Sequence, residues 1–156
     1  METVSFYETP LGGMGIADDG RAVTRVFFSS QKEGGAESAL ARNTYGQLME
    51  YFEGKRRDFA IPLDPKGTAF QLRVWKALSE IPYGETRSYK QIAEQIGHPK
   101  ACRAVGMANN RNPIAILIPC HRVIGSNGTL VGYGGGLSVK ERLLQLEAGD
   151  RPQGEA

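Results

Sequence analysis

Two helix start signals constrain the fold of this 156-residue chain more than any other feature. Thr68 with Gln71, and Ser88 with Gln91, each have the spacing of a capping box, in which two side chains satisfy backbone N–H groups at a helix start. Each box is followed by apolar residues at helical spacing, which predicts two amphipathic helices. The apolar stripes are Phe70, Val74, Ala77, Leu78 and Ile81 in the first helix, and Tyr89, Ile92, Ala93 and Ile96 in the second.

The residues after the second helix predict a helix-turn-helix. Gly97 suits the end of that helix, and Pro99 suits the start of the next one. The third helix is expected to bury Ala101, Ala104, Val105 and Ala108, and to leave Cys102, Arg103, Gly106 and Asn109 outward. Mostly small outward residues are poor readers of base edges in a major groove, but they allow close approach to sugars and phosphates in a minor groove.

The charge of the chain is unevenly distributed. Residues 66–125 carry nine Lys/Arg against three acids, so this segment is +6 although the whole chain is only +2. A basic face of this kind is either simply solvated or binds phosphates. Charge alone does not decide between these two readings.

The first 65 residues predict a small α/β unit. Residues 4–7, 15–17 and 22–28 have the pattern of strands, and 59–61 could add a short edge strand. A helix with Ala41, Tyr45, Leu48 and Phe52 on its apolar face is expected to end at Gly54. Nothing in this part suggests chemistry. We therefore expect a structural α/β domain over 1–65, a mostly helical domain over 66–150, and a tail over 151–156.

The cysteine and histidine content excludes several classes of site. The chain has two cysteines, Cys102 and Cys120, and two histidines, His98 and His121, with no disulfide framework and no metal-ligand spacing. We expect no metal and no zinc. The N-terminus lacks a signal-peptide core and no apolar run is long enough to span a membrane. These observations favour a reducing cytoplasm.

The segment Ile118-Pro119-Cys120-His121-Arg122-Val123 is the strongest candidate for chemistry. It follows the apolar run 114–118, and it places an imidazole directly beside a thiol. A thiol is a strong nucleophile only as the thiolate, which a neighbouring imidazole or cation favours. The alternative is an inert buried cysteine, the usual fate of a free thiol after an apolar run.

This segment, read with its surroundings, resembles the O6-alkylguanine-DNA alkyltransferases, which are the methylated-DNA–protein-cysteine methyltransferases. The resemblance is dense from about residue 70 to 149, and its specificity comes from the order of several motifs. These are Ser88-Tyr89, Pro99-Lys100-Ala101, Arg103-Ala104-Val105-Gly106, Asn112-Pro113, Pro119-Cys120-His121-Arg122 and Tyr133-Gly134-Gly135-Gly136-Leu137. It implies an α/β N-terminal domain followed by a mostly α-helical, winged helix-turn-helix-like DNA-binding and catalytic domain.

The resemblance assigns the catalytic roles. Cys120 would attack the alkyl carbon and keep the alkyl group as a thioether, so the protein would act once and need no cofactor. His121 would take the thiol proton, through a water in relatives, and Glu147 would orient the imidazole. Asn112 would tie the active-site turn to the helix-turn-helix. Tyr89 would donate its hydroxyl to guanine N3 as the base leaves.

The same resemblance assigns the DNA and pocket contacts. Double-stranded DNA would bind through its minor groove, and Arg103 would fill the stack left by a flipped nucleotide. The other DNA-contacting residues would be Ser88, Lys100, Ala101, Gly106 and Arg111. The pocket would be lined by Ala115, Val123, Tyr133 and Gly134, with the carbonyls of Cys120 and Val123 reading the exocyclic amine. Residues 132–136 would form a lid, and the small Gly134 and Ala115 favour larger alkyl groups.

The final helix is expected to be capped by Ser138 and Glu141, with Val139, Leu143 and Leu146 inside. The substrate would be O6-alkylguanine, and also O4-alkylthymine, and the protein would be a monomer. Three alternatives stay open: a non-catalytic alkyltransferase-like lesion binder, a helix-turn-helix regulator, and a cysteine hydrolase. The first would lack the reactive cysteine, the second would not need Cys120, His121 and Glu147, and the third would need an oxyanion hole that the sequence does not reveal.

Overall fold

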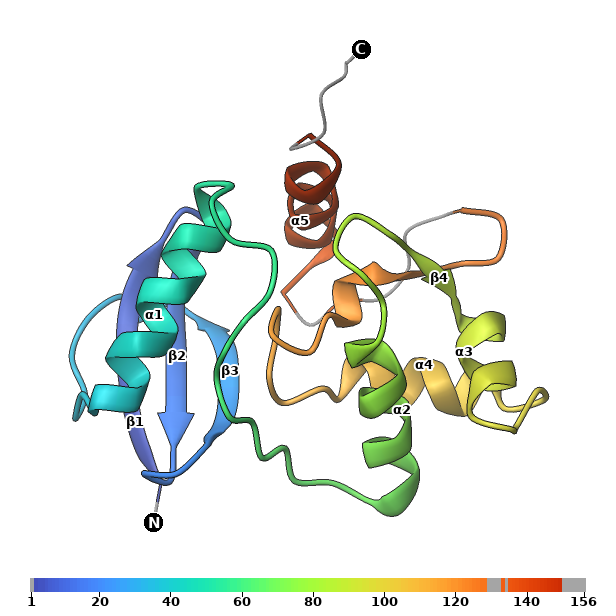
Figure 1. The fold of residues 1–156 in the computed structure, drawn as a ribbon, viewed down its shortest axis with the longest axis horizontal. Helices are drawn as coiled ribbons and strands as arrows, with labels where there is room; N and C mark the ends of the chain where they lie inside the picture. Colours follow the sequence, from blue (N-terminus) through green and yellow to red (C-terminus); the bar gives the residue numbers. More distant parts are fainter. Residues whose placement is uncertain (1, 129–132, 134, 150–156) are drawn as a thin grey trace. The chain divides into compact units, whose positions relative to one another are not determined.

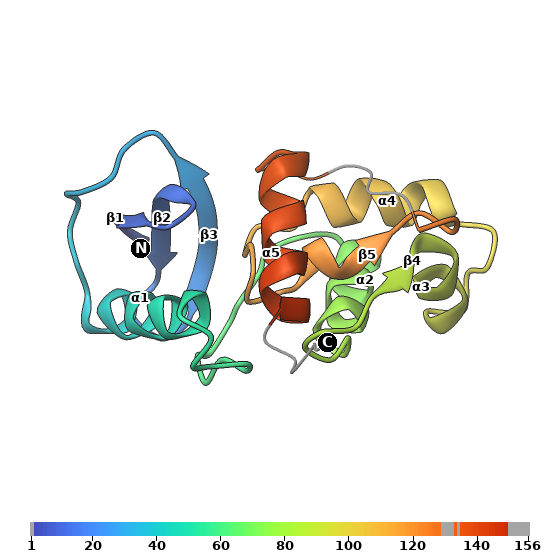
Figure 2. The ribbon, with the colours of Figure 1, turned by 90° about the horizontal axis from the view of Figure 1, so that it is seen from above.

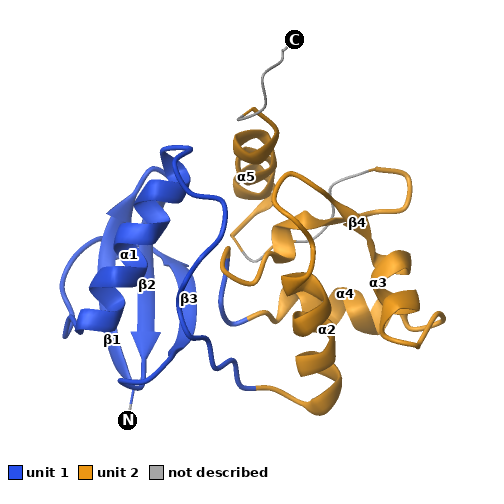
Figure 3. Ribbon diagram, viewed as in Figure 1, with its two compact units in different colours: residues 1–66, 113–115 blue, residues 67–112, 116–156 orange. Residues whose placement is uncertain are grey.

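The computed structural model describes residues 2–128, 133 and 135–149. It divides into two compact units, drawn in different colours in Figure 3. Unit 1 comprises residues 1–66 together with 113–115, and unit 2 comprises residues 67–112 and 116–156. The short return of the chain at 113–115 means that unit 1 is built from two separate stretches of sequence.

Unit 1 is a three-stranded antiparallel sheet with one helix along it (Figure 1). The strands are β1 (Thr3–Thr9), β2 (Gly12–Asp18) and β3 (Val23–Ser29), in the order β1-β2-β3. They confirm the three predicted strands: β1 and β2 extend beyond the predicted ranges, and β3 is shifted by one residue. The helix is α1 (Ala39–Phe52), and its core side chains include Ala41, Leu48 and Tyr51, which are buried with Met14 and Ile16 of β2.

The predicted edge strand over 59–61 is wrong. The backbone N–H of Ala60 donates instead to the Gln47 side chain of α1, at 2.9 Å. Strand-like pairing with β3 begins only at the next residues, where the Val23 N–H donates to Pro62 O and the Asp64 N–H donates to Val23 O, both at 2.8 Å. The side chain of Gln47 thus satisfies the backbone N–H of Ala60, and the chain joins β3 only from Pro62 onward.

Helix α1 ends just before Gly54, as predicted, but its buried face differs from the prediction. The Ser38 hydroxyl caps the N-terminus by accepting from the Ala41 N–H at 2.9 Å, and Gly54 follows the helix with a φ of 76°. Tyr51 is buried where we expected Phe52. Tyr45 lies at the edge of the face, where its ring stacks on Tyr7 with 4.2 Å between the centroids.

Unit 2 consists of helices and a very small sheet (Figure 2). The main helices are α2 (Ala69–Ser79), α3 (Tyr89–Gln95), α4 (Cys102–Asn110) and α5 (Leu137–Gly149), with the 3₁₀ turn η1 (Cys120–Arg122). Strand β4 (Arg87–Ser88) pairs in parallel with β5 (Val123–Ile124). Both capping boxes are confirmed: each has its pair of side-chain-to-backbone hydrogen bonds, at 2.8–3.1 Å.

Helices α3 and α4 form the helix-turn-helix, but α4 starts later than predicted. Gly97 ends the α3 turn with a φ of 83°, as expected for a glycine after a helix. Pro99 does not start α4, because the Ala101 N–H donates to His98 O at 2.9 Å and closes a separate turn over Pro99 and Lys100. Helix α4 then begins at Cys102. Its position is fixed from α2, where the Trp75 indole N–H donates to Ala108 O at 2.8 Å.

The buried face of α4 corrects two predictions. Val105, Ala108 and Asn109 are buried, whereas Ala104 is exposed. Packing against α2 and α3 sets the buried face of α4, and the polarity of Asn109 gave no sign that its side chain would be buried there. Neither amide atom of Asn109 has a hydrogen-bond partner among the described residues.

Helix α5 also differs from its sequence pattern. Ser138 does not cap it, because the helix begins at Leu137 and Gly136 O accepts the Lys140 N–H at 3.1 Å. The fully buried side chains are Lys140, Leu143 and Glu147, whereas Val139 and Leu146 are half-buried. Two charged residues, Lys140 and Glu147, therefore lie on the inner face of the helix. Lys140 donates to Val123 O, and Glu147 bonds the side chains of His121 and Arg122. No helix of the described residues is long and apolar enough to cross a membrane.

Candidate active site

The 3₁₀ turn η1 holds Cys120 inside unit 2. Pro119 precedes the turn, the Cys120 N–H donates to Ile118 O at 2.7 Å, and the Arg122 N–H donates to Pro119 O at 3.0 Å. The cysteine is 6% exposed. Because β5 follows directly and pairs with β4, the turn is anchored at its C-terminal end. The thiol is thus held in a largely buried position.

The chain before η1 contains an unusual backbone conformation. Ile116 has a φ of 71° and is buried. Positive φ is costly for a β-branched residue, by roughly 1–3 kcal/mol, and it persists only where surrounding structure imposes it. Such strain is often found at functional sites. Here it lies four residues before the thiol.

Burial dominates the ionisation of the thiol. It raises the pKa of Cys120 to about 11, against the opposing effects of a hydrogen bond from the Asn112 side chain and of the Lys140 charge. The resting site therefore holds a neutral thiol at neutral pH. A thiolate requires a base within the site, which is the role predicted for the adjacent histidine.

His121 is fully buried and bonded to Glu147. Its Nε2 lies 2.7 Å from Glu147 Oε2, whereas its Nδ1 is buried with no partner among the described residues. Burial lowers the pKa of His121, although Glu147 opposes this effect. Since the carboxylate accepts, the proton of the neutral ring sits on Nε2 and Nδ1 carries a lone pair. The imidazole is thereby in the form that accepts a proton.

Arg122 is part of this site, and the sequence analysis did not find it. Its Nε donates to Glu147 Oε1 at 2.8 Å and its Nη2 to Glu147 Oε2 at 3.0 Å, while Nη1 donates to Ile81 O at 2.6 Å. The Gly84 N–H also donates to Glu147 Oε1, at 3.3 Å. Although burial raises it, the pKa of Glu147 falls to about 2 because of the hydrogen bonds from His121 and Arg122. The signal in the sequence was an arginine directly after the Cys-His pair.

Lys140 is a second group that the sequence analysis missed. Its side chain is completely buried and its Nζ donates to Val123 O at 2.6 Å. Burial lowers the pKa of Lys140 to about 8, and its charge lowers the pKa of Cys120. A lysine at an inner position of an amphipathic helix is the only signal that the sequence offered. The Val123 carbonyl, predicted to face the substrate, is thus bonded to a cation.

Asn112 and Tyr89 lie at this same site. The Asn112 amide donates to Ile118 O at 2.8 Å, so it bridges the end of α4 to the turn that carries Cys120. Burial and the nearby Cys120 raise the pKa of Tyr89, which keeps its hydroxyl protonated at neutral pH. A Cβ added to Gly106 would lie 3.8 Å from the Tyr89 ring, so α4 approaches this ring closely.

The predicted DNA-facing residues lie on α4 and beside it. Lys100, Arg103 and Arg111 are exposed, Ala101 is the N-terminal cap residue of α4, and Ser88 caps α3. These residues are on the helix-turn-helix, as the family pattern implies. Their contacts with DNA stay a prediction.

The predicted pocket residues are placed less uniformly. Tyr133 is half-buried, and burial together with Cys120 raises its pKa well above its usual range. Ala115 belongs to unit 1, where its N–H donates to Val26 O at 2.9 Å. Of the expected lid over 132–136, Gly132 and Gly134 lie outside the described residues.

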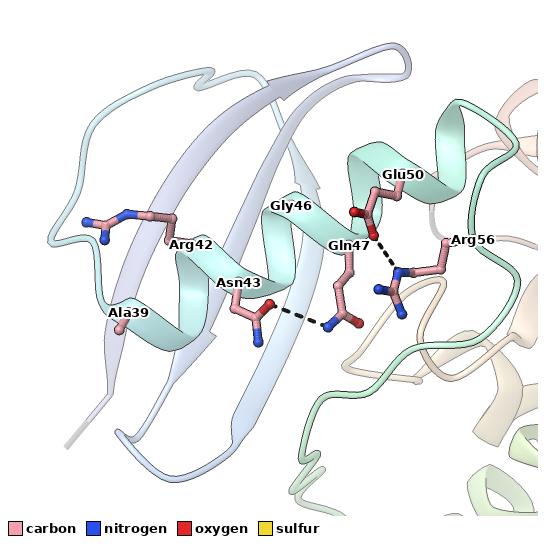
Figure 4. Close-up of a pocket in the computed structure, with 7 residues that line it drawn as sticks. All are labelled: Ala39, Arg42, Asn43, Gly46, Gln47, Glu50 and Arg56. Carbon is pink, nitrogen blue, oxygen red and sulfur yellow. Dashed lines mark hydrogen bonds and ion pairs between the residues drawn. The ribbon is translucent and has the colours of Figure 1, made fainter.

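A hollow elsewhere on the surface lacks comparable chemistry. It runs along α1 in unit 1 and contains the Glu50–Arg56 ion pair, at 2.7 Å (Figure 4). Its lining is Ala39, Arg42, Asn43, Gly46, Gln47, Glu50 and Arg56. No cysteine or histidine reaches it, so the candidate active site remains the cluster around Cys120.

Comparison with known proteins decides the family. Residues 3–65 match the ribonuclease-like domain of 6-O-methylguanine DNA methyltransferase, and residues 69–149 match its DNA-binding domain. The chain belongs to the 6-O-methylguanine DNA methyltransferase family. A methylated-DNA–protein-cysteine methyltransferase of Methanosarcina acetivorans is 50% identical over 150 residues, which cover 92% of this chain and 96% of that protein.

Other family members agree in sequence and in structure. The methylated-DNA–protein-cysteine methyltransferase of Mycobacterium leprae is 51% identical over 146 residues, or 90% of this chain and 88% of that protein. The crystal structure of the Mycobacterium tuberculosis O6-methylguanine methyltransferase has a TM-score of 0.89, 46% identity, and coverage of 97% of this chain and 96% of that one. The Mycobacterium tuberculosis protein in complex with DNA has a TM-score of 0.86 at 46% identity, covering 96% and 94%.

Proposed function

We propose that this methyltransferase family member repairs DNA by transferring the alkyl group of O6-alkylguanine, and of O4-alkylthymine, to Cys120 in a single turnover. The observation that carries the proposal is the buried thiol next to a histidine whose Nδ1 is left without a partner among the described residues. A lesion binder without chemistry has no need of this array. A regulator that used only the helix-turn-helix would not need it either.

The transfer step follows from the hydrogen bonds around His121. Glu147 holds Nε2–H, so Nδ1 takes the Cys120 proton, directly or through a water. The thiolate attacks the alkyl carbon in line, the S–C bond forms, and the C–O6 bond breaks with its electron pair going to guanine. The product is a thioether, which is not displaced under mild conditions, so the protein is consumed.

Tyr89 and Lys140 support the departure of the base. Because burial and Cys120 raise the pKa of Tyr89, its hydroxyl keeps the proton that guanine N3 needs as the base leaves. Lys140 holds a positive charge near the sulfur and bonds Val123 O, whose carbonyl we propose reads the exocyclic amine. Together they favour negative charge first on the thiolate and then on the leaving base.

Access to the lesion requires the duplex to be opened. We propose that α4 lies along the minor groove, that the alkylated nucleotide flips into the site, and that Arg103 takes its place in the stack. Exposed Lys100 and Arg111, with Ser88, Ala101 and Gly106, would contact the backbone. The protein acts as a monomer in the cytoplasm, where a reducing environment keeps Cys120 free.

Mass spectrometry tests the proposal. After incubation with duplex DNA containing O6-methylguanine, the peptide with Cys120 should gain one methyl group per protein molecule, about 14 Da by the composition of CH₂. Cys102 serves as the internal control, since it has no adjacent base. Repeated turnover with an unmodified Cys120, or methylation of Cys102 instead, would contradict the proposed mechanism.

A further inference from the structure

A methionine lies exposed in the middle of the proposed DNA-binding helix. Met107 is 59% exposed, and it is the most exposed of the large apolar side chains among the described residues. A single exposed apolar side chain is normal on a protein surface. Its position is what distinguishes Met107, because the family pattern carried over above gives it no role.

Met107 lies between two arginines on one face of α4. Arg103, Met107 and Arg111 are spaced by four residues, so they follow one another along the same side of the helix and its C-terminal cap position. All three are exposed, as is Ala104 beside them. The opposite side carries the buried Val105 and Ala108. Along its exposed side, α4 therefore presents a cation, an apolar group and a second cation in turn.

We propose that Met107 is a DNA-contacting residue that packs its thioether side chain against the deoxyribose walls of the minor groove, one helical turn from Arg103. The inference rests on the proposed function, because it requires α4 to face the duplex. Arg103 enters the base stack and Arg111 contacts a backbone phosphate one helical turn beyond Met107, which leaves the apolar group over the sugars between them. Methionine is among the apolar side chains that proteins insert into a minor groove.

The chemistry of methionine suits a contact that must serve any sequence. Its side chain is unbranched, flexible and polarizable, so it adapts to sugars and base edges without requiring a particular hydrogen-bond pattern. Its neighbour Gly106 has no side chain and lies close to the Tyr89 ring. Met107 is thus the long apolar side chain on the exposed face of α4.

The test compares binding at several salt concentrations. Proteins carrying Cys120→Ser, which cannot react, are titrated into a labelled duplex containing O6-methylguanine and followed by fluorescence anisotropy. Met107→Ala should raise Kd about five-fold, because the variant no longer buries about half of a methionine side chain against the DNA. The slope of log Kd against log salt should not change. Arg111→Gln should instead reduce that slope by about 1, because it removes a phosphate contact.

Two controls separate the possible outcomes. Leu72→Ala removes another exposed apolar side chain, on α2, and should leave Kd unchanged. With Cys120 restored, Met107→Ala should react with free O6-benzylguanine at the parent rate. Unchanged duplex affinity in Met107→Ala, with a loss in Arg103→Ala, would overturn the role of Met107 alone. Unchanged affinity in both variants would contradict the proposed DNA face of α4. If Met107→Ala slowed the reaction with free O6-benzylguanine as much as it weakened duplex binding, the groove contact would be overturned.

Discussion

Glu147→Gln is the substitution that tests the site most directly. Among the described residues, the carboxylate of Glu147 accepts from His121 Nε2, Arg122 Nε and Nη2, and the Gly84 N–H. A glutamine has the same shape, but one of its two terminal groups is a donor. Whichever way the amide turns, its NH₂ faces two other donors, so two hydrogen bonds are lost at a buried position.

The pKa of Glu147 gives the expected magnitude. Its fall from 4.5 to about 2 in the folded protein corresponds to roughly 3 kcal/mol of stability at neutral pH. Because the folded pKa is depressed, this contribution is complete above the unfolded pKa and is lost as pH falls towards the folded value. Glu147→Gln should therefore lower the free energy of unfolding by about 3 kcal/mol at pH 7, and by less than half of this at pH 3.

Urea unfolding at the two pH values measures this effect. Glu141→Gln is the matched control, since it changes an exposed glutamate on the same helix and should leave stability unchanged within about 0.5 kcal/mol. The same variants are assayed for transfer from O6-benzylguanine, where Glu147→Gln should be slower by about 10²-fold because His121 loses its orienting acceptor. A loss of stability that did not depend on pH would refute the assignment of the effect to the carboxylate charge.

Three further predictions concern stability and rate, each measured by urea unfolding and by transfer from O6-benzylguanine. Lys140→Met should stabilise the protein by about 2 kcal/mol at pH 7, because removing a buried cation whose pKa falls to about 8 outweighs the loss of its one hydrogen bond to Val123 O. The same variant should transfer the alkyl group more slowly. A variant less stable than the parent would contradict this prediction. In the parent, this group makes stability rise with pH above about 8, because its folded pKa lies below the unfolded one. Asn109→Leu should raise stability by about 1–2 kcal/mol, because it removes a buried amide that has no hydrogen-bond partner among the described residues. A loss of stability would show that the amide is hydrogen-bonded. Ser88→Ala should lower the free energy of unfolding by about 1 kcal/mol, because it removes the N-terminal cap of α3. Transfer from the free base should change little. An unchanged stability would show that this cap is not needed.

The sequence predicted the elements of the fold better than their inner faces. The two capping boxes and the strand pattern depend on neighbouring residues, and they hold in the structure. Segment 59–61 and the start of α4 were wrong because Gln47 and a turn at His98 satisfy the backbone there, and these are contacts that local patterns do not contain. Asn109 shows the same limit, since helix packing decided its burial against its polarity.

The candidate site was predictable only where a local motif marked it. Cys120 and His121 are adjacent in the sequence, and the family resemblance supplied Glu147. Arg122 and Lys140 escaped notice because an isolated arginine or lysine is usually a surface residue. Their importance comes from bonds to groups that are distant along the chain, such as Ile81 and Val123.

The position of Glu147 has a consequence for the newly made chain. The carboxylate that holds His121 follows it by 26 residues, on the last described helix. During synthesis, Cys120 and His121 leave the ribosome before α5 can fold against them. The proposed array around Cys120 is therefore complete only once α5 has packed against η1, so activation of the thiol depends on tertiary folding and not on the Cys-His pair alone.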